Sequence, residues 1–218
     1  MIRLPPDLDW RPTPQDFFAL DVSNPDWVHD LGGSNPLPID LKDGGPHSAL
    51  LMTFAREGKA YLLDRAELGG ADHPLDAQAI AISGIITSPA TYRVGHDTMV
   101  AFQANGSSCP GDAKNVGAMA LRISGGPQPT VQTAWCAKFS GWQEAAIVTT
   151  SDDVTDPIVW IVGAESDEKL HGFRGDTGQE LFKGDPLTGL RHFVAVLAAA
   201  GRLYVAGDGQ VFAYGFAR

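Results

Sequence analysis

Two cysteines and six histidines are the residues of this sequence whose types most often bind metals or catalyse reactions. The cysteines are Cys109 and Cys136, and the histidines are His29, His47, His73, His96, His171 and His192. No two histidines form a His-x-x-x-His pair, and no histidine stands at zinc-ligand spacing from a cysteine. The sequence therefore predicts neither a metal site nor a catalytic site built on these residues.

His171 lies inside a strand pattern, next to Gly172. It would be either a packed, hydrogen-bonded strand residue or a general base, since histidine titrates close to neutral pH. No nucleophile pattern accompanies it: the chain has no Gly-x-Ser-x-Gly elbow and no Gly-x-x-x-x-Gly-Lys-Ser/Thr phosphate loop. We expect the structural role.

Cys109 and Cys136 are 27 positions apart, and both lie beside turn or strand-end sequence. They could form a disulfide, which would contribute about 3 kcal/mol by the loop-entropy estimate, or they could remain two free thiols. If they pair, the insertion from Asn105 to Asn115 is pinned to the following segment. Because function in repeat proteins is often carried by such loops, this insertion is a candidate binding loop.

Aspartates in turns offer a second kind of chemistry, since carboxylate oxygens are the ligands that Ca²⁺ prefers. Asp152, Asp153 and Asp176 are the candidates. Aspartate in a turn also caps backbone amides, and this is the role that we expect. The sequence predicts no bound calcium.

The charge balance excludes several partners. Lys and Arg total 16 and Asp and Glu total 26, which gives a net charge of −10. Such a field repels nucleic acid and anionic lipid, and no basic cluster offsets it. The longest uncharged run, Ala77 to Tyr92, is too short and too broken to span a bilayer. The first residues do not have the pattern of a signal peptide.

The elements that position these residues are predicted to be short strands. With 25 Gly and 15 Pro in 218 residues, long helices are disfavoured. An apolar strand, a polar turn and a second apolar strand recur at 49–64, 98–123, 157–174 and 202–214. Each pair follows another apolar stretch, and three pairs precede an outer strand such as 179–183. The sequence predicts an all-β chain of about four four-stranded antiparallel units. Repetition of such a unit along the chain is typical of a β-propeller, in which each unit is one blade.

This pattern divides the chain into a first segment and four blades. Residues 1–30 would be a strand of an earlier blade or the strand that closes the ring. The blades would cover about 31–80, 81–140, 141–187 and 188–218. The last blade ends at Phe216 without an outer strand, so its edge is open to association.

Three segments share a motif in which a strand ends in a small and an aromatic residue, followed by a turn with Asp and Gly. They are Leu170–Phe182, Gly58–Gly69 and Gly201–Tyr214, and their turn residues are Asp64, Gly69, Asp176, Thr177, Gly178, Asp208 and Gly209. This motif resembles the repeat of the pyrroloquinoline-quinone-like (PQQ-like) β-propellers. Glycine permits the tight reversal, and Asp and Thr can satisfy turn amides.

The chain is also similar to uncharacterised exported bacterial members of that superfamily, in Asp30–Pro36, Ala134–Cys136 and His171–Gly178. The resemblance implies the C-terminal part of a larger propeller, a partial ring rather than a small closed one. It also implies an extracytoplasmic location, in the periplasm or secreted.

A quinoprotein dehydrogenase would bring bound PQQ and Ca²⁺, a disulfide between adjacent cysteines and a Trp floor under the quinone. The cysteines here are not adjacent, and Trp135 and Trp160 are candidates for the floor only by residue type. We expect both to pack between blades, so we predict no cofactor and leave open whether the chain is an enzyme.

Three functions follow from these observations. The first is a non-catalytic scaffold or binding module whose rim loops bind a protein, a peptide or a glycan. The second is a fragment of a PQQ- and Ca²⁺-dependent alcohol or sugar dehydrogenase. The third is a structural protomer that self-associates through open strand edges, at Phe216 or at the first segment.

Overall fold

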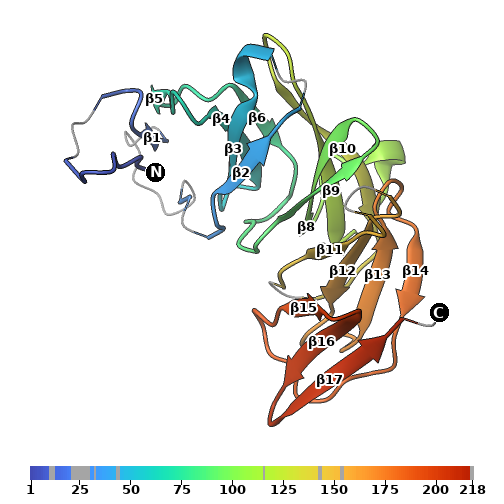
Figure 1. The fold of residues 1–218 in the computed structure, drawn as a ribbon. Helices are drawn as coiled ribbons and strands as arrows, with labels where there is room; N and C mark the ends of the chain where they lie inside the picture. Colours follow the sequence, from blue (N-terminus) through green and yellow to red (C-terminus); the bar gives the residue numbers. More distant parts are fainter. Residues whose placement is uncertain are drawn as a thin grey trace. The chain divides into compact units, whose positions relative to one another are not determined.

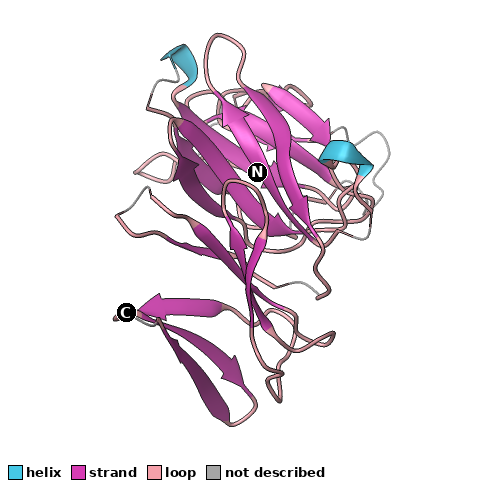
Figure 2. Ribbon diagram, turned by 90° about the vertical axis from the view of Figure 1, so that its right-hand side faces the viewer, coloured by secondary structure: helices cyan, strands magenta, loops and turns pink. Residues whose placement is uncertain are grey.

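The computed structural model shows an all-β chain (Figure 1) and describes residues 1–9, 13–20, 30–31, 33–42, 45–114, 116–141, 144–152 and 155–216. Helix within these ranges is confined to two short 3-10 turns, η2 (Gly45–His47) and η3 (Pro110–Asp112), drawn in cyan in Figure 2. Of the residues singled out in the sequence, His29, Asn115, Asp153 and part of the first segment lie outside the described ranges.

Four antiparallel sheets follow one another along the chain, three of four strands and one of three. The first contains β2 (Leu37–Asp40), β3 (Ala49–Phe54), β4 (Lys59–Asp64) and β6 (Asp76–Ala79). The second contains β7 (Ala90–Val94), β8 (Asp97–Gln103), β9 (Ala118–Ser124) and β10 (Thr130–Ala137). The third contains β11 (Ile147–Thr149), β12 (Ile158–Val162), β13 (Leu170–Arg174) and β14 (Glu180–Lys183). The fourth contains β15 (Val196–Ala199), β16 (Arg202–Gly207) and β17 (Gln210–Gly215).

The strands neighbour one another in sequence order, as a chain of hairpins requires. The middle strands are buried along almost their whole length, as in β8 and β12, whereas the outer strand β14 is exposed throughout. A strand that is buried on both faces reads as a continuous apolar run, which is why the middle strands were the clearest signals in the sequence. The predicted fold class is confirmed: the chain is all-β and is built of propeller-type antiparallel sheets.

The chain divides into two compact units. The first comprises Met1–Ile86 with Ile123–Gln132, and the second comprises Thr87–Arg122 with Thr133–Arg218. In the first unit, β1 (Phe18–Ala19) pairs in parallel with β5 (Gly70–Ala71). Phe18 is fully buried in a cluster with Tyr61 and Leu63. The first segment therefore packs on the sheet β2–β6, a pairing that strand patterns alone did not reveal.

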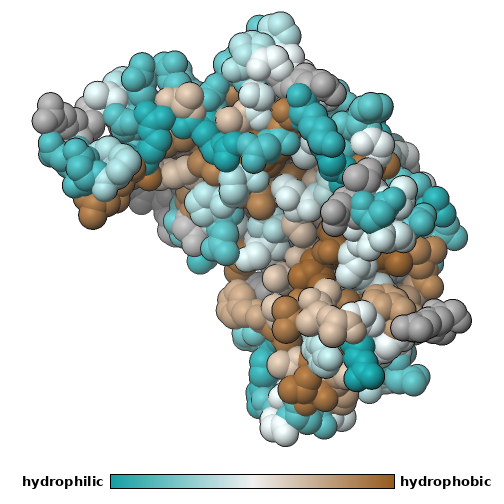
Figure 3. Space-filling model, in the orientation of Figure 1, coloured by the Kyte–Doolittle hydropathy of each residue, from teal (hydrophilic) through white to brown (hydrophobic). Residues whose placement is uncertain are grey.

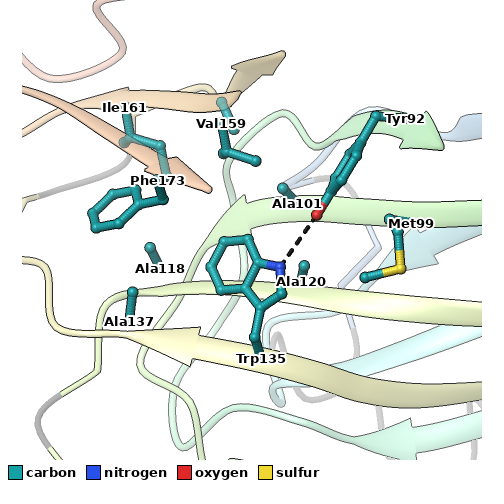
Figure 4. Close-up of a cluster of buried hydrophobic side chains, with 11 residues drawn as sticks. Tyr92, Met99, Ala101, Ala118, Ala120, Trp135, Ala137, Val159, Ile161 and Phe173 are labelled. Atoms are coloured by element: carbon teal, nitrogen blue, oxygen red, sulfur yellow. Dashed lines mark hydrogen bonds between the residues drawn. The ribbon is translucent and has the colours of Figure 1, made fainter. Parts of the chain in front are cut away.

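Two core clusters hold the second unit together. One joins the sheet β7–β10 to the sheet β11–β14 and includes Tyr92, Trp135 and Phe173 (Figure 4). The other joins β11–β14 to β15–β17 and includes Trp160 and Leu203. Within this unit, neighbouring sheets thus bury faces against each other, which is how propeller blades acquire a core.

Candidate functional site

Trp135 on β10 docks onto the turn that follows β13. Its indole Nε1 donates to the carbonyl oxygen of Gly175 at 2.7 Å, and the Tyr92 hydroxyl donates to the same oxygen at 2.7 Å. Figure 4 shows the indole nitrogen directed at the Tyr92 hydroxyl. Burial raises the pKa of Tyr92, so the hydroxyl remains a donor at neutral pH. A carbonyl oxygen has two lone pairs, and both are used here to fix the turn.

The predicted turn residues Asp176, Thr177 and Gly178 form this docked turn. Asp176 accepts a hydrogen bond from Arg174 Nε at 2.8 Å, and that bond lowers the pKa of the carboxyl despite its partial burial. Thr177 Oγ1 accepts from the Gln179 amide at 3.4 Å. Gly178 has a φ of +71°, and a Cβ there would lie 2.5 Å from the Trp135 ring. Only glycine satisfies both conditions.

The remaining predicted turn residues lie in turns of other sheets. Asp64 accepts from the Ala66 amide at 2.7 Å and contacts His47 Nδ1 at 2.6 Å. Gly69 has a φ of +94°. Asp208 pairs with Arg191, and Gly209 has a φ of +68° at the tip of the β16–β17 hairpin. Three of the seven predicted turn residues, Asp176, Thr177 and Gly178, therefore lie together in the docked turn. The other four lie in turns of other sheets.

A pocket of about 350 Å³ opens beside the docked turn, at the ends of the strands, and we call it the rim pocket. It lies between the β7–β8 turn, the segment entering β12 and the end of β13. The residues that line it are Val94, Gly95, Thr155, Asp156, Pro157, Ile158, Arg174, Asp176 and Leu181. Three of the nine, Arg174, Asp176 and Leu181, belong to the repeat-motif segment Leu170–Phe182. The pocket therefore lies beside the turn that Trp135 and Tyr92 hold in place.

The rim pocket combines an apolar wall with an excess of negative charge. Leu181 on β14 is 51% exposed and forms part of that wall. The charged residues are Asp156, Arg174 and Asp176, that is, two carboxylates against one guanidinium. No histidine, cysteine or lysine is among the described residues that line it. This composition suits binding of an apolar group next to a cation, and it provides no pair of nucleophile and base.

His171 is buried, with 2% of its surface exposed, and both ring nitrogens face carboxylates. Nδ1 lies 2.7 Å from Glu180 Oε1, and Nε2 lies 3.0 Å from Asp167 Oδ2. The ring stacks on Phe173 and meets the edge of Phe139. Its role is a packed and hydrogen-bonded strand residue, as expected. The two carboxylate partners were missed: Asp167 lies in the loop before β13, and Glu180 lies in the motif segment but meets His171 only once β13 and β14 pair.

Asp167 is the centre of this network. Lys183 Nζ lies 3.1 Å from its carboxylate, in addition to His171. Burial acts to raise the pKa of Asp167, but the hydrogen bonds from His171 and Lys183 outweigh it, so the pKa is lowered. The ionised form of Asp167 therefore stabilises the folded chain.

The structure joins Cys109 and Cys136 in a disulfide, with Cα atoms 5.7 Å apart. The bond ties the loop that carries η3 to strand β10. Ser108 Oγ and Thr133 Oγ1 add a hydrogen bond of 2.7 Å between the same loop and strand. The insertion is thus held near its middle, at Cys109, by a covalent link, and neither thiol is available as a nucleophile.

The residues considered for cofactors have other contacts. Asp152 caps the Thr155 amide at 2.7 Å. Trp160 Nε1 donates to Thr149 Oγ1 at 2.8 Å, and Trp135 and Trp160 are each 4–5% exposed. With both indoles enclosed in packing and no adjacent cysteines, these residues do not fit a quinone site. Across the described ranges, no cluster of three or more His, Cys, Asp and Glu side chains could hold a metal ion.

No described helix is long and apolar enough to cross a membrane.

Comparison with known proteins finds no matching family model and no matching curated protein. Among solved structures, the β-propeller domain of Cps50 (Swd1) from Myceliophteria thermophila is 10% identical, with a TM-score of 0.52 over 84% of this chain and 52% of that one. Its likeness shows the β-propeller fold.

Two further solved structures are similar at lower TM-scores. BamB from Moraxella catarrhalis is 16% identical, with a TM-score of 0.47 over 84% of this chain and 46% of that one. The quinohemoprotein alcohol dehydrogenase ADHIIG from Pseudomonas putida is 17% identical, with a TM-score of 0.40 over 78% of this chain and 33% of that one. The chain spans about half the length of the Cps50 and BamB structures.

Proposed function

We propose that this chain is a non-catalytic binding module of a β-propeller, and that its rim pocket binds a short protein segment. The segment would place an apolar side chain against Leu181 and Ile158 and a lysine or arginine beside Asp156. The observation that carries the proposal is the composition of the rim pocket, an apolar wall with two carboxylates against one guanidinium. Such a site attracts cations and rewards burial of an apolar group.

The same composition favours a peptide over the other ligands of propeller rims. Sugars commonly stack on aromatic rings, and no aromatic side chain is among the described residues of the pocket. Nucleic acid is disfavoured by the net charge of −10. A basic, apolar protein segment is complementary to both the wall and the charge.

We also propose that the chain belongs to an exported protein of bacterial type and forms the C-terminal part of a larger ring of PQQ-like repeats. The disulfide between Cys109 and Cys136 supports an oxidising compartment, because such bonds rarely persist in the cytosol. The match to 52% of the Swd1 propeller domain supports a larger ring. The repeat motif supports the PQQ-like type.

A selection experiment tests the proposed binding. Short random peptides displayed on phage are selected on the immobilised chain and then measured against two variants. Leu181→Glu introduces a charge into the wall of the rim pocket, and Leu197→Glu introduces the same charge at a leucine that is 62% exposed and does not line it. Selected peptides should carry an apolar residue next to Lys or Arg, and should bind wild type and Leu197→Glu at least about tenfold more tightly than Leu181→Glu.

Equal binding to both variants would place the peptides elsewhere and contradict the proposal.

The dehydrogenase alternative has its own test, the dye-linked oxidation of alcohols and sugars after addition of PQQ and Ca²⁺. Turnover in that assay would show that the chain is not a purely non-catalytic module.

A further inference from the structure

Leu181 reaches the wall of the rim pocket from an irregular position in β14. Gly172 of β13 lies opposite Phe182. The next residue of β13, Phe173, lies opposite Glu180. Leu181 is therefore the extra residue of a β-bulge, an irregularity that bends a strand and redirects a side chain. The bulge is what turns this leucine toward the pocket that it lines.

The bulged strand has few means of holding this shape by burial. β14 is exposed along its whole length, and Figure 3 shows apolar side chains over it. The two neighbours of Leu181 are each held from within the sheet. Phe182 meets the ring of Trp160 edge to face, with ring centroids 5.8 Å apart. Glu180 Oε1 lies 2.7 Å from Nδ1 of the buried His171. The direction of the Leu181 side chain therefore depends on these two contacts.

His171 connects β14 to the loop before β13. Its other ring nitrogen, Nε2, lies 3.0 Å from Asp167 Oδ2, and Lys183 Nζ at the end of β14 lies 3.1 Å from the same carboxylate. The imidazole ring stacks on Phe173, with an angle of 6° between the planes. The network thus fastens β14 on both sides of the bulge, at Glu180 before it and at Lys183 after it.

The protonation state of His171 determines how many of these hydrogen bonds the ring can donate. The imidazolium has two N–H groups, one for each carboxylate, whereas the neutral ring has one N–H and one lone pair. Glu180 has a side chain that is 42% exposed, against 26% for Asp167, and Asp167 also keeps Lys183. When the ring loses a proton, the contact with Glu180 is therefore the one that water replaces.

Two further elements contact His171. The strand β12 pairs with β13 and carries no charged residue over Ile158–Val162. The segment that contributes the Phe139 ring also carries Lys138, which is exposed, and Glu144, which is buried. Beside the rim pocket, His96 follows the lining residue Gly95 and is a second histidine whose charge could affect binding.

We propose that His171 is a positioning residue of the rim pocket: through Glu180 it fixes the bulge of β14 that carries Leu181, and loss of a ring proton loosens this wall. Binding of a basic, apolar segment then weakens as the pH rises through the titration of His171. This inference rests on the proposed function of the rim pocket. Its sign separates it from simple electrostatics, because removing a positive charge from His171 or His96 would by itself favour a basic ligand.

The first measurement needs no ligand. In the full chain, the methyl signals of Leu181 and the imidazole signals of His171 are followed by nuclear magnetic resonance from about pH 6 to about pH 9. We expect both sets of signals to shift with the same midpoint. His171→Phe keeps an aromatic ring against Phe173 but has no N–H donor, so the Leu181 shift should disappear. His192→Phe removes the exposed pair with Glu165 and, as the matched control, should leave the shift unchanged.

The second measurement uses a phage-selected peptide that contains no histidine and whose binding requires Leu181. His171→Phe should weaken its binding at least about threefold at about pH 6, and the wild-type affinity should fall by a similar factor between about pH 6 and about pH 9. Glu180→Ala should weaken binding in the same way. Glu180→Gln, which keeps an oxygen that accepts from Nδ1, should retain most of the affinity. His96→Gln should leave the fall with pH in place.

The two measurements separate this inference from the proposed function. Leu181 signals that do not follow the titration of His171, or that still shift in His171→Phe, would overturn it whether or not a peptide binds. A wild-type affinity that is constant or rises with pH would also overturn it. If His171→Phe does not fold, Glu180→Ala takes its place in the methyl measurement. If no selected peptide requires Leu181, the proposed function fails, and the methyl signals still decide the role of His171.

Discussion

Gly178 and Trp135 form the contact on which the description of the rim pocket depends. The glycine is needed for two separate reasons, its φ of +71° and the 2.5 Å approach of the indole to an added Cβ. Trp135 in turn donates to Gly175, so ring packing and hydrogen bonding act on the same four-residue turn. A turn held in this way keeps Arg174 and Asp176 in fixed positions beside the pocket.

Replacing Gly178 or Gly209 with alanine, one at a time, separates the cost of the positive φ from the cost of the steric clash with Trp135. Gly209 has a φ of +68° but nothing within 4 Å of an added Cβ, so Gly209→Ala should cost only the backbone strain, about 1 kcal/mol. Gly178→Ala adds a steric clash with Trp135 and should cost at least about 1 kcal/mol more. Urea unfolding of the two variants measures the difference, and equal destabilisation would show that Trp135 does not dock tightly.

The lowered pKa of Asp167 predicts a pH dependence of stability. Its folded pKa lies below the unfolded value of about 4, so its contribution is present above about pH 4 and is lost as the pH falls through the folded pKa. Asp167→Asn should lower stability at neutral pH, and should also reduce the further loss on acidification, because the titrating group is gone. Unfolding free energies from about pH 6 down to about pH 3 check this.

The control for that measurement is Asp97→Asn, since Asp97 forms an exposed ion pair with Arg122. Exposed pairs contribute little, so this variant should follow the wild-type curve. If Asp167→Asn and Asp97→Asn gave the same pH profile, the network around His171 would have no special part in stability.

At the scale of the elements, hairpin strands were predictable and their tertiary partners were not. The predicted strand 49–55 corresponds to β3 and the predicted strand 59–64 to β4, because apolar runs bounded by glycine turns leave few alternatives. Pairing of β1 with β5 was missed, since each is two residues long and carries no periodicity.

The motif residues Asp176, Thr177 and Gly178 were found from spacing. Their contact with Trp135 was not, because it joins different sheets.

The disulfide is the element-scale link between the β8–β9 insertion and β10. Replacing Cys109 and Cys136 together with serine removes a covalent loop of 27 residues and should lower the free energy of unfolding by about 3 kcal/mol. The far-ultraviolet circular dichroism spectrum should be retained, since the strands have their own cores. Chemical denaturation of both forms provides the measurement, and an unchanged unfolding midpoint would show that the loop is held by other contacts.

At the scale of the whole molecule, the rim pocket is the surface to which the proposed function assigns binding. It is small, partly apolar and negatively charged, and its preference for a basic, apolar segment agrees with the net charge of −10. The sequence predicted a binding module from the propeller pattern, but it could not locate the pocket, because the lining residues are spread from Val94 to Leu181 and meet only in the folded sheets.

The central claim is that the rim pocket binds a basic, apolar protein segment, and a crystal structure of the chain with a phage-selected peptide tests it most directly. The account predicts that an apolar side chain of the peptide lies against Ile158 and Leu181, and that a lysine or arginine of the peptide lies within hydrogen-bond distance of Asp156. A peptide bound elsewhere on the chain, with the rim pocket empty, would contradict it.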